Sequence, residues 1–168
     1  MQRSTESTVI LIGLTIAWAL GILGGIVGPG TAQTWLWSIS SIGLLAGVAV
    51  LAAHTVTFDT LFASGLLLLA IGEAVIHVQG PSGLDAFAAA TFAYLPGLVL
   101  IALSDWEPAW TRLTALIAGA AFGAHVISYL SGSDIGPEGV LAAIGYGFLT
   151  LTLIGWTWSI YRRGLRGA

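Results

Sequence analysis

LFASGLLLLAIGEAVIHV, residues 61–78, decides the fold class of this chain. The stretch is apolar and close to the roughly 20 residues that a helix needs to cross a bilayer. It nevertheless contains Glu73 and, four residues later, His77. Residues four apart share one face of a helix, and an ionisable residue inside a membrane span indicates a functional site because its exposure to lipid is costly. The stretch therefore predicts a membrane helix that carries a polar site.

The composition of the whole chain agrees with a membrane location. Of its 168 residues, 57% are hydrophobic and only 8% are charged, and the mean hydropathy is +0.94. Soluble domains contain about 25% charged residues. We therefore expect an integral membrane protein in contact with the lipid bilayer, with residues 1–168 forming a single transmembrane domain.

Missing residue types exclude several kinds of chemistry. The chain has no Cys, which rules out disulfides, thiolate metal sites and iron–sulfur clusters. It has no Lys, so a retinal or pyridoxal Schiff base cannot form. The five basic residues, all Arg, do not make a nucleic-acid patch, and we expect no nucleic-acid partner.

Hydropathy predicts an all-α bundle of six transmembrane helices. Turn-like segments rich in Gly, Pro and Ser separate the apolar stretches, and short loops make sequence neighbours pack antiparallel. The predicted spans are 8–28, 35–54, 59–79, 84–103, 109–130 and 138–160.

Arginine placement predicts the orientation of these spans. Cytoplasmic loops are enriched in Arg and Lys, and all five arginines lie on one side if both termini are cytoplasmic. We therefore predict a multi-pass protein of the cell membrane with cytoplasmic N- and C-termini. Tryptophans are then expected as two interfacial belts, with Trp106, Trp110, Trp156 and Trp158 on the cytoplasmic side and Trp35 and Trp37 on the outer side.

The two halves of the chain, residues 8–79 and 84–160, share a weak repeat. Thr15-Ile16-Ala17-Trp18 corresponds to Thr91-Phe92-Ala93-Tyr94, and Ile71-Gly72-Glu73 corresponds to Ile144-Gly145-Tyr146. Because three spans is an odd number, the copies would have inverted topology, as in many transporters. Chance is the alternative, since Ala, Gly and Leu are abundant here.

Four polar residues are predicted to lie in one layer of the outer half of the membrane. At 1.5 Å per residue, Glu73 lies about 5 Å outside the midplane, His77 about 10 Å and His125 about 7–8 Å, and Tyr146 matches the depth of Glu73. Burial favours the neutral form of a carboxylic acid, and histidine changes its charge near neutral pH. The layer of Glu73, His77, His125 and Tyr146 therefore predicts a proton relay, or a polar path for a small solute, in a transporter or channel.

Small residues support close helix packing in such a bundle. Gly21/Gly25, Gly43/Gly47 and Gly119/Gly123 each have the spacing that lets membrane helices approach. Small-residue faces also allow association into a homo-oligomer or into a larger membrane complex.

Three alternatives to transport stay open at this stage. His77 and His125 could be axial ligands of a b-type haem, although no cofactor at all is the favoured expectation. Glu73, His77 and His125 together could bind zinc or iron. Finally, Glu73 could only tie helices together in an accessory subunit. No residue is assigned a catalytic role, and we do not expect an enzyme.

Polar residues near the predicted cytoplasmic loops have simpler interpretations. His54 and Asp59 are expected to form an interfacial pair. Asp105 and Glu107 are expected to help start the fifth span, since acidic groups suit a helix N-terminus. Ser38, Ser40 and Ser41 could face a cavity or bond to backbone.

Overall fold

The structure, a computed structural model, describes residues 5–57, 59–79, 84–132 and 139–163. This part of the chain is entirely helical apart from its turns. Its helices are α1 Thr5–Val27, α2 Thr31–Thr55, α3 Thr60–Gln79, α4 Leu84–Leu103, α5 Ala109–Leu130 and α6 Val140–Arg163. All six predicted spans are confirmed to within a few residues.

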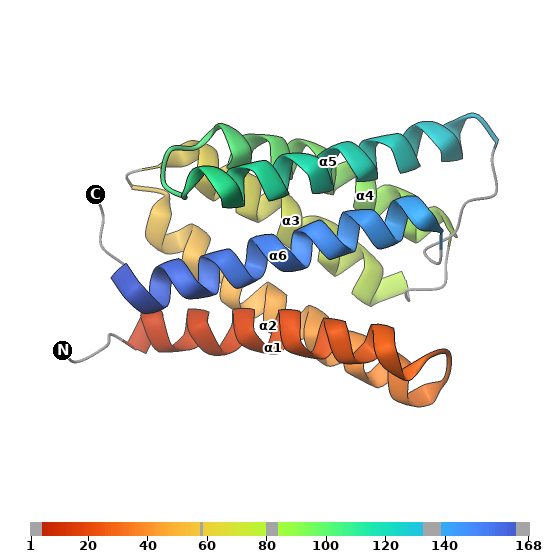
Figure 1. Cartoon of the computed structure of the whole chain (residues 1–168), viewed down its shortest axis with the longest axis horizontal. Coiled ribbons are helices and arrows are strands. Elements are labelled where there is room, and N and C mark those ends of the chain that lie inside the picture. Colours follow the sequence, from red (N-terminus) through yellow and green to blue (C-terminus); the bar gives the residue numbers. More distant parts are fainter. Residues whose placement is uncertain (1–4, 58, 80–83, 133–138, 164–168) are drawn as a thin grey trace.

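The helices form a closed ring in which each contacts its sequence neighbours, and α6 returns to contact α1 (Figure 1). The beginning of α1 and the end of α6 lie at the same end of the bundle, which we call the terminal end (Figure 1). The end of α2, the start of α3, the end of α4 and the start of α5 also lie there, and the remaining helix ends lie at the opposite end, the far end (Figure 1).

The lengths of the helices fit a membrane. Within the described residues, α1, α2, α3, α5 and α6 are each long and apolar enough to cross a bilayer. The described apolar stretch of α4, Phe87–Leu103, is somewhat shorter. Many large apolar side chains on the outside of the ring, such as Ile26 and Leu130, are exposed. This is the surface of a multi-pass membrane protein, whose outer face meets lipid rather than water.

Glycines set the closest helix crossings. A Cβ atom on Gly13 of α1 would lie 2.7 Å from the carbonyl oxygen of Gly43 on α2, and one on Gly65 of α3 would lie 2.5 Å from that of Gly97 on α4. The predicted pair Gly43/Gly47 therefore lies in a helix crossing, whereas a Cβ on Gly25 would meet nothing within 4 Å. The 3+3 inverted repeat stays a prediction.

Aromatic side chains fill the centre of the ring. Phe62 of α3 reaches across to Trp156 of α6, with ring centroids 5.6 Å apart, and also packs on Trp106 at 4.6 Å. Trp156 is fully buried and Trp106 is half-buried. The prediction that Trp156 belongs to an interfacial belt is therefore wrong, because its ring lies in the core between the helices. Trp106 packs against this core from the loop before α5, and its place in a belt stays a prediction. Trp35, Trp110 and Trp158 are exposed.

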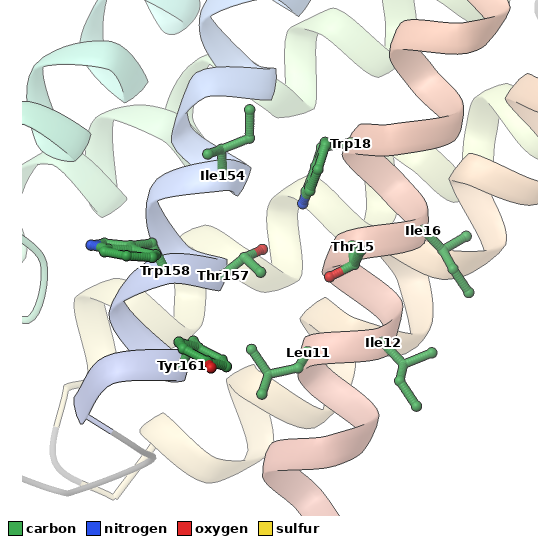
Figure 2. Close-up of a pocket in the computed structure, with 9 residues that line it drawn as sticks. All are labelled: Leu11, Ile12, Thr15, Ile16, Trp18, Ile154, Thr157, Trp158 and Tyr161. Atoms are coloured by element: carbon green, nitrogen blue, oxygen red, sulfur yellow. The ribbon is translucent and has the colours of Figure 1, made fainter.

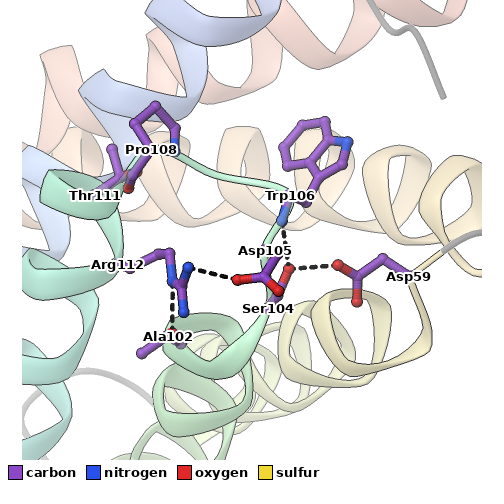
Figure 3. Close-up of polar contacts among 8 residues, drawn as sticks. All are labelled: Asp59, Ala102, Ser104, Asp105, Trp106, Pro108, Thr111 and Arg112. Atoms are coloured by element: carbon purple, nitrogen blue, oxygen red, sulfur yellow. Dashed lines mark hydrogen bonds and ion pairs between the residues drawn. The ribbon is translucent and has the colours of Figure 1, made fainter. Parts of the chain in front are cut away.

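Polar contacts at the terminal end fix the loop between α4 and α5 (Figure 3). Asp59 accepts hydrogen bonds from the Phe62 backbone N–H, at 2.8 Å, and from the Ser104 hydroxyl. Arg112 pairs with Asp105 at 2.7 Å and donates to the carbonyl of Ala102.

His54 has a different acidic partner from the one predicted. Its Nδ1 atom lies 3.4 Å from a carboxylate oxygen of Glu6, at the start of α1. The predicted pair of His54 with Asp59 is therefore wrong. Asp59 is instead engaged as the cap of α3, and His54 contacts the helix that packs beside its own.

Candidate functional site

Glu73 lies inside the bundle, with only 7% of its surface exposed. Each carboxylate oxygen accepts a hydrogen bond from a hydroxyl on a different helix. The Ser41 hydroxyl of α2 donates to Oε1, and the Tyr94 hydroxyl of α4 donates to Oε2. Glu73 therefore ties three helices together through one carboxyl group.

Tyr146 of α6 completes the surroundings of this carboxyl group. Its hydroxyl hydrogen-bonds with that of Tyr94 and lies near the charge of Glu73, and its ring centroid lies 6.5 Å from that of Tyr94 in an edge-on arrangement. Phe122 of α5 packs against both tyrosines, at 5.1 Å from Tyr94 and 5.3 Å from Tyr146. The carboxyl group thus faces hydroxyls inside an aromatic shell, and the predicted proximity of Glu73 and Tyr146 is found.

Two glycines allow the aromatic rings to reach this position. A Cβ atom on Gly72 would lie 2.6 Å from Cε1 of Tyr94, so only glycine lets this ring pack so close to α3. On α6, a Cβ atom on Gly145 would lie 2.6 Å from the Phe122 ring. Each of these glycines directly precedes a polar residue of the site, Glu73 or Tyr146.

The hydrogen bonds of Glu73 are compatible with two protonation states. As a carboxylate, it accepts from both Ser41 and Tyr94. As a neutral acid, it donates its own proton to one of these hydroxyls, because a hydroxyl oxygen both donates and accepts. Neither state needs a heavy atom to move far. Among the described residues, no Arg or His forms an ion pair with Glu73, so these hydroxyls are its polar partners.

His125 of α5 is fully buried, and neither ring nitrogen has a hydrogen-bond partner among the described residues. Its ring lies edge-on to Phe87 of α4, with centroids 4.8 Å apart, and Phe87 lies 6.0 Å from Tyr146. His125 therefore belongs to the same aromatic cluster as Tyr146 without contacting Glu73. An unpaired buried polar group of this kind costs about 1–3 kcal/mol, which makes it a functional candidate.

His77 lies elsewhere. It is exposed in the last turn of α3, near the far end of the bundle. Its helix does not contact α5, because α4 lies between them in the ring. The assignment of His77 and His125 as axial ligands of a haem stays a prediction, because the two ligands of a haem lie on its opposite faces and need not contact each other. In the described part of the chain, no three His, Asp or Glu side chains gather as metal ligands would, which includes the predicted set Glu73, His77 and His125.

Sequence reasoning missed Ser41 and Tyr94 as partners of Glu73. Ser41 was one of three closely spaced serines with no preferred face. Tyr94 did carry a signal, since it is the polar aromatic residue of its span and matches Trp18 in the weak repeat. The glycine directly before Glu73 was a second signal, because it makes room for a ring.

A separate groove of about 560 Å³ lies on the outside of the bundle, between α1 and α6 (Figure 2). Its walls are mostly apolar and include Leu11, Trp18 and Ile154, with Thr15 and Thr157 as polar exceptions. The residues around Glu73 do not line it. The groove is therefore a feature of the outer surface and not an entrance to the carboxyl site.

Comparisons with known proteins do not identify this site. No protein-family model, no curated protein and no solved structure matches the chain.

Proposed function

We propose that this protein is a proton-linked membrane transporter or channel, in which Glu73 binds and releases the transported proton. The observation that carries the proposal is the buried Glu73 carboxyl group with its hydroxyl partners Ser41 and Tyr94. A carboxyl group inside a membrane bundle is costly to retain and usually marks an ion or proton pathway. The proposal covers both a proton that crosses the membrane alone and a proton that crosses together with a small solute.

The surroundings of Glu73 support proton exchange more than a purely structural role. A structural tie between helices needs only a neutral hydrogen-bonding group, as an amide or hydroxyl would supply. An acid that can lose its proton adds a desolvation cost with no gain in packing. Partners that can reverse their hydrogen bonds let Glu73 exist in both states, which a proton carrier must do.

Tyr146 and the two histidines have subordinate roles in this proposal. Tyr146 hydrogen-bonds with Tyr94, which contacts the carboxyl group, and would pass a proton beyond it. His125 is buried beside Phe87, its ring nitrogens have no partner in the described part of the chain, and it would accept a proton in the same layer. His77, exposed near the far end of α3, would mark the exit from the membrane.

The direction of the pathway follows from the charges. Arg112, in the first turn of α5, and Arg162, in the last turn of α6, belong to the terminal end of the bundle, and arginine favours the cytoplasmic side. We therefore place the terminal end in the cytoplasm of a cell, and the Glu73 layer in the outer half of its membrane. Association with further copies through exposed small residues is compatible with this placement.

Proton flux in liposomes tests the proposal. Purified protein is reconstituted with a pH-sensitive dye inside the vesicles, and a potassium diffusion potential drives proton entry. Wild-type protein should raise the flux above that of empty liposomes, and Glu73→Gln should abolish the increase. Gln suits this site because its amide both accepts and donates. Glu6→Gln, at an exposed position, is the control and should leave the flux unchanged.

Equal flux from the wild type and Glu73→Gln would overturn the proposal. Correct folding of each variant is checked by circular dichroism and by a single symmetric peak in size-exclusion chromatography.

A further inference from the structure

A second buried carboxyl group lies at the terminal end of the bundle. Glu107, directly before the Pro108 cap of α5, is only 4% exposed. Its Oε2 atom accepts hydrogen bonds from Ser159 of α6, at 3.2 Å, and from Thr111 of α5, at 3.3 Å. The sequence predicts only that Glu107 helps to start α5, and this role does not require burial against α6.

The two carboxyl groups lie at different depths. Glu107 belongs to the terminal-end loop, whereas Glu73 lies 13 residues after the start of α3, about 20 Å into the bundle at 1.5 Å per residue. A protein that moves protons through Glu73 needs groups that connect this depth with the terminal end.

Threonine hydroxyls continue from Glu107 along the seam between α5 and α6. Thr114 donates to the Thr111 carbonyl oxygen at 2.9 Å. The hydroxyls of Thr114 and Thr152 lie 2.8 Å apart, across the two helices. Thr152 is fully buried and donates to the Phe148 carbonyl oxygen at 2.9 Å. Polar atoms therefore follow one another from Glu107 to the Phe148 carbonyl, along the part of α6 that also carries Tyr146.

These hydroxyls have more acceptors than protons. Thr111 lies close to the Glu107 carboxylate and, at 2.7 Å, to the Pro108 carbonyl oxygen, but it has one proton to donate. Thr114 and Thr152 share two protons among two backbone carbonyls and their mutual contact. In this seam each hydroxyl can therefore turn its proton from one acceptor to another, while its own oxygen can accept a proton, and a stepwise relay requires both.

Local bonding alone does not explain the seam. Threonine in a helix commonly donates to the carbonyl four residues earlier, as Thr157 does to Leu153 at 2.8 Å. Thr157, however, lines the outer groove between α1 and α6. Thr152 adds a contact to another helix, complete burial and a connection that ends at a carboxyl group.

We propose that Glu107 is a second proton-binding residue and that the hydroxyls of Thr111, Thr114 and Thr152, joined by bridging waters, lead from it toward Tyr146 and Glu73. The inference rests on the proposed function and deepens it, by adding the route on the terminal side of Glu73. Because backbone carbonyl oxygens have no proton to pass on, the route uses one water between the Thr111 and Thr114 hydroxyls and water between the Thr152 and Tyr146 hydroxyls. Arg112 does not serve this route, because it is engaged with Asp105 and Ala102.

The test uses the same proteoliposomes with two pairs of matched variants. Glu107→Gln is compared with Glu6→Gln, which changes an exposed Glu at the same end. Thr152→Val is compared with Thr157→Val, because both threonines donate to a carbonyl of their own helix but only Thr152 belongs to the seam. Glu107→Gln and Thr152→Val should each lower the flux about tenfold, which corresponds to about 1.4 kcal/mol in the barrier. Both controls should keep the wild-type flux.

The outcomes separate this inference from the function on which it rests. If Glu73→Gln abolishes flux while Glu107→Gln and Thr152→Val keep the wild-type rate, the seam is only structural and the inference is overturned. If wild-type flux equals that of Glu73→Gln, the proposed function fails and the inference fails with it. If Glu107→Gln does not fold, Thr152→Val decides between these outcomes, because valine has the shape of threonine.

Discussion

Tyr94 occupies the space that a side chain at Gly72 would need. The ring atom Cε1 of Tyr94 lies 2.6 Å from the position of a Cβ atom on residue 72, and the Ala90 carbonyl oxygen lies 2.8 Å from it. The hydroxyl of the same tyrosine reaches Glu73, the next residue of α3. Helix packing and the polar site are thus parts of one arrangement, in which the missing side chain at Gly72 allows the hydrogen bond at Glu73.

Gly72→Ala should therefore disturb both stability and function. Overpacking of this kind costs about 1–3 kcal/mol, against which alanine gains about 1 kcal/mol in helix propensity. We expect a lower free energy of unfolding, measured by SDS titration in mixed micelles, together with reduced proton flux.

Gly147→Ala is the matched control for this substitution. A Cβ atom on Gly147 of α6 would meet nothing within 4 Å, so this variant should be as stable as the wild type or more so. Equal effects of the two substitutions would show that the Tyr94 ring can move to make room for a methyl group at residue 72, so that its position does not require Gly72.

The hydrogen bond between Tyr94 and Glu73 should be measurable as a coupling energy. Tyr94→Phe keeps the ring and removes the hydroxyl, which leaves Oε2 of Glu73 without its donor and should cost about 1–3 kcal/mol. In a Glu73→Met background the same substitution should cost little, because the acceptor has gone. A double-mutant cycle from four unfolding titrations gives the coupling. Additive effects of the two substitutions would mean that this contact contributes no stability.

His125 should show opposite effects on stability and on flux. Both its ring nitrogens lack partners among the described residues while the ring packs edge-on to Phe87. His125→Phe keeps an aromatic ring at this position and removes the buried polar atoms, so we expect the free energy of unfolding to rise by about 1 kcal/mol. If His125 serves the proton route, flux should fall in the same variant, as is usual where function retains an unfavourable residue.

A less stable His125→Phe protein would contradict this expectation. It would show that the ring nitrogens hold a group in the folded protein, such as an ordered water. Unchanged flux in a stable variant would instead remove His125 from the route and leave Glu73 in place.

Much of this fold could be predicted from the sequence, because membrane spans are defined by length and hydropathy alone. The predicted and observed ranges of the fifth helix, residues 109–130, are identical. Burial of Glu73 also followed from the energetic cost of a carboxyl group in lipid, and its neighbour Tyr146 followed from matched depth.

The partners of each polar residue were harder to predict, because depth does not determine how a helix is rotated about its axis. In water, an apolar stripe shows which face of a helix is inside. In a membrane both faces are apolar, so Tyr94 and Ser41 could not be assigned to the carboxyl group. His77 shows the same limit: the four-residue spacing put it beside Glu73, but the end of α3 leaves it exposed. The rotation of each helix depends on close contacts at glycines. The sequence does not show which glycine contacts which neighbouring helix.

Asp59 and Asp105 offer a final comparison at the terminal end of the bundle. Asp59 directly precedes α3 and accepts from the backbone N–H of Phe62, the third residue of the helix, which is the contact of an N-terminal cap. It also accepts from Ser104 in the loop before α5 (Figure 3). Asp59→Ala should lower the free energy of unfolding by about 1–2 kcal/mol, since caps contribute about this much.

Asp105→Ala should leave the stability unchanged in the same assay, although Asp105 also makes an ion pair. The Asp105 side chain is 93% exposed, and water and salt screen its attraction to Arg112. Raising the salt concentration should therefore not change the difference between the Asp59 variant and the wild type, because a backbone cap is short-ranged. A loss in the Asp105 variant equal to that in the Asp59 variant would mean that the loop is held by its charges. Burial and the hydrogen bonds of Asp59 would then not be what fixes the loop against α3.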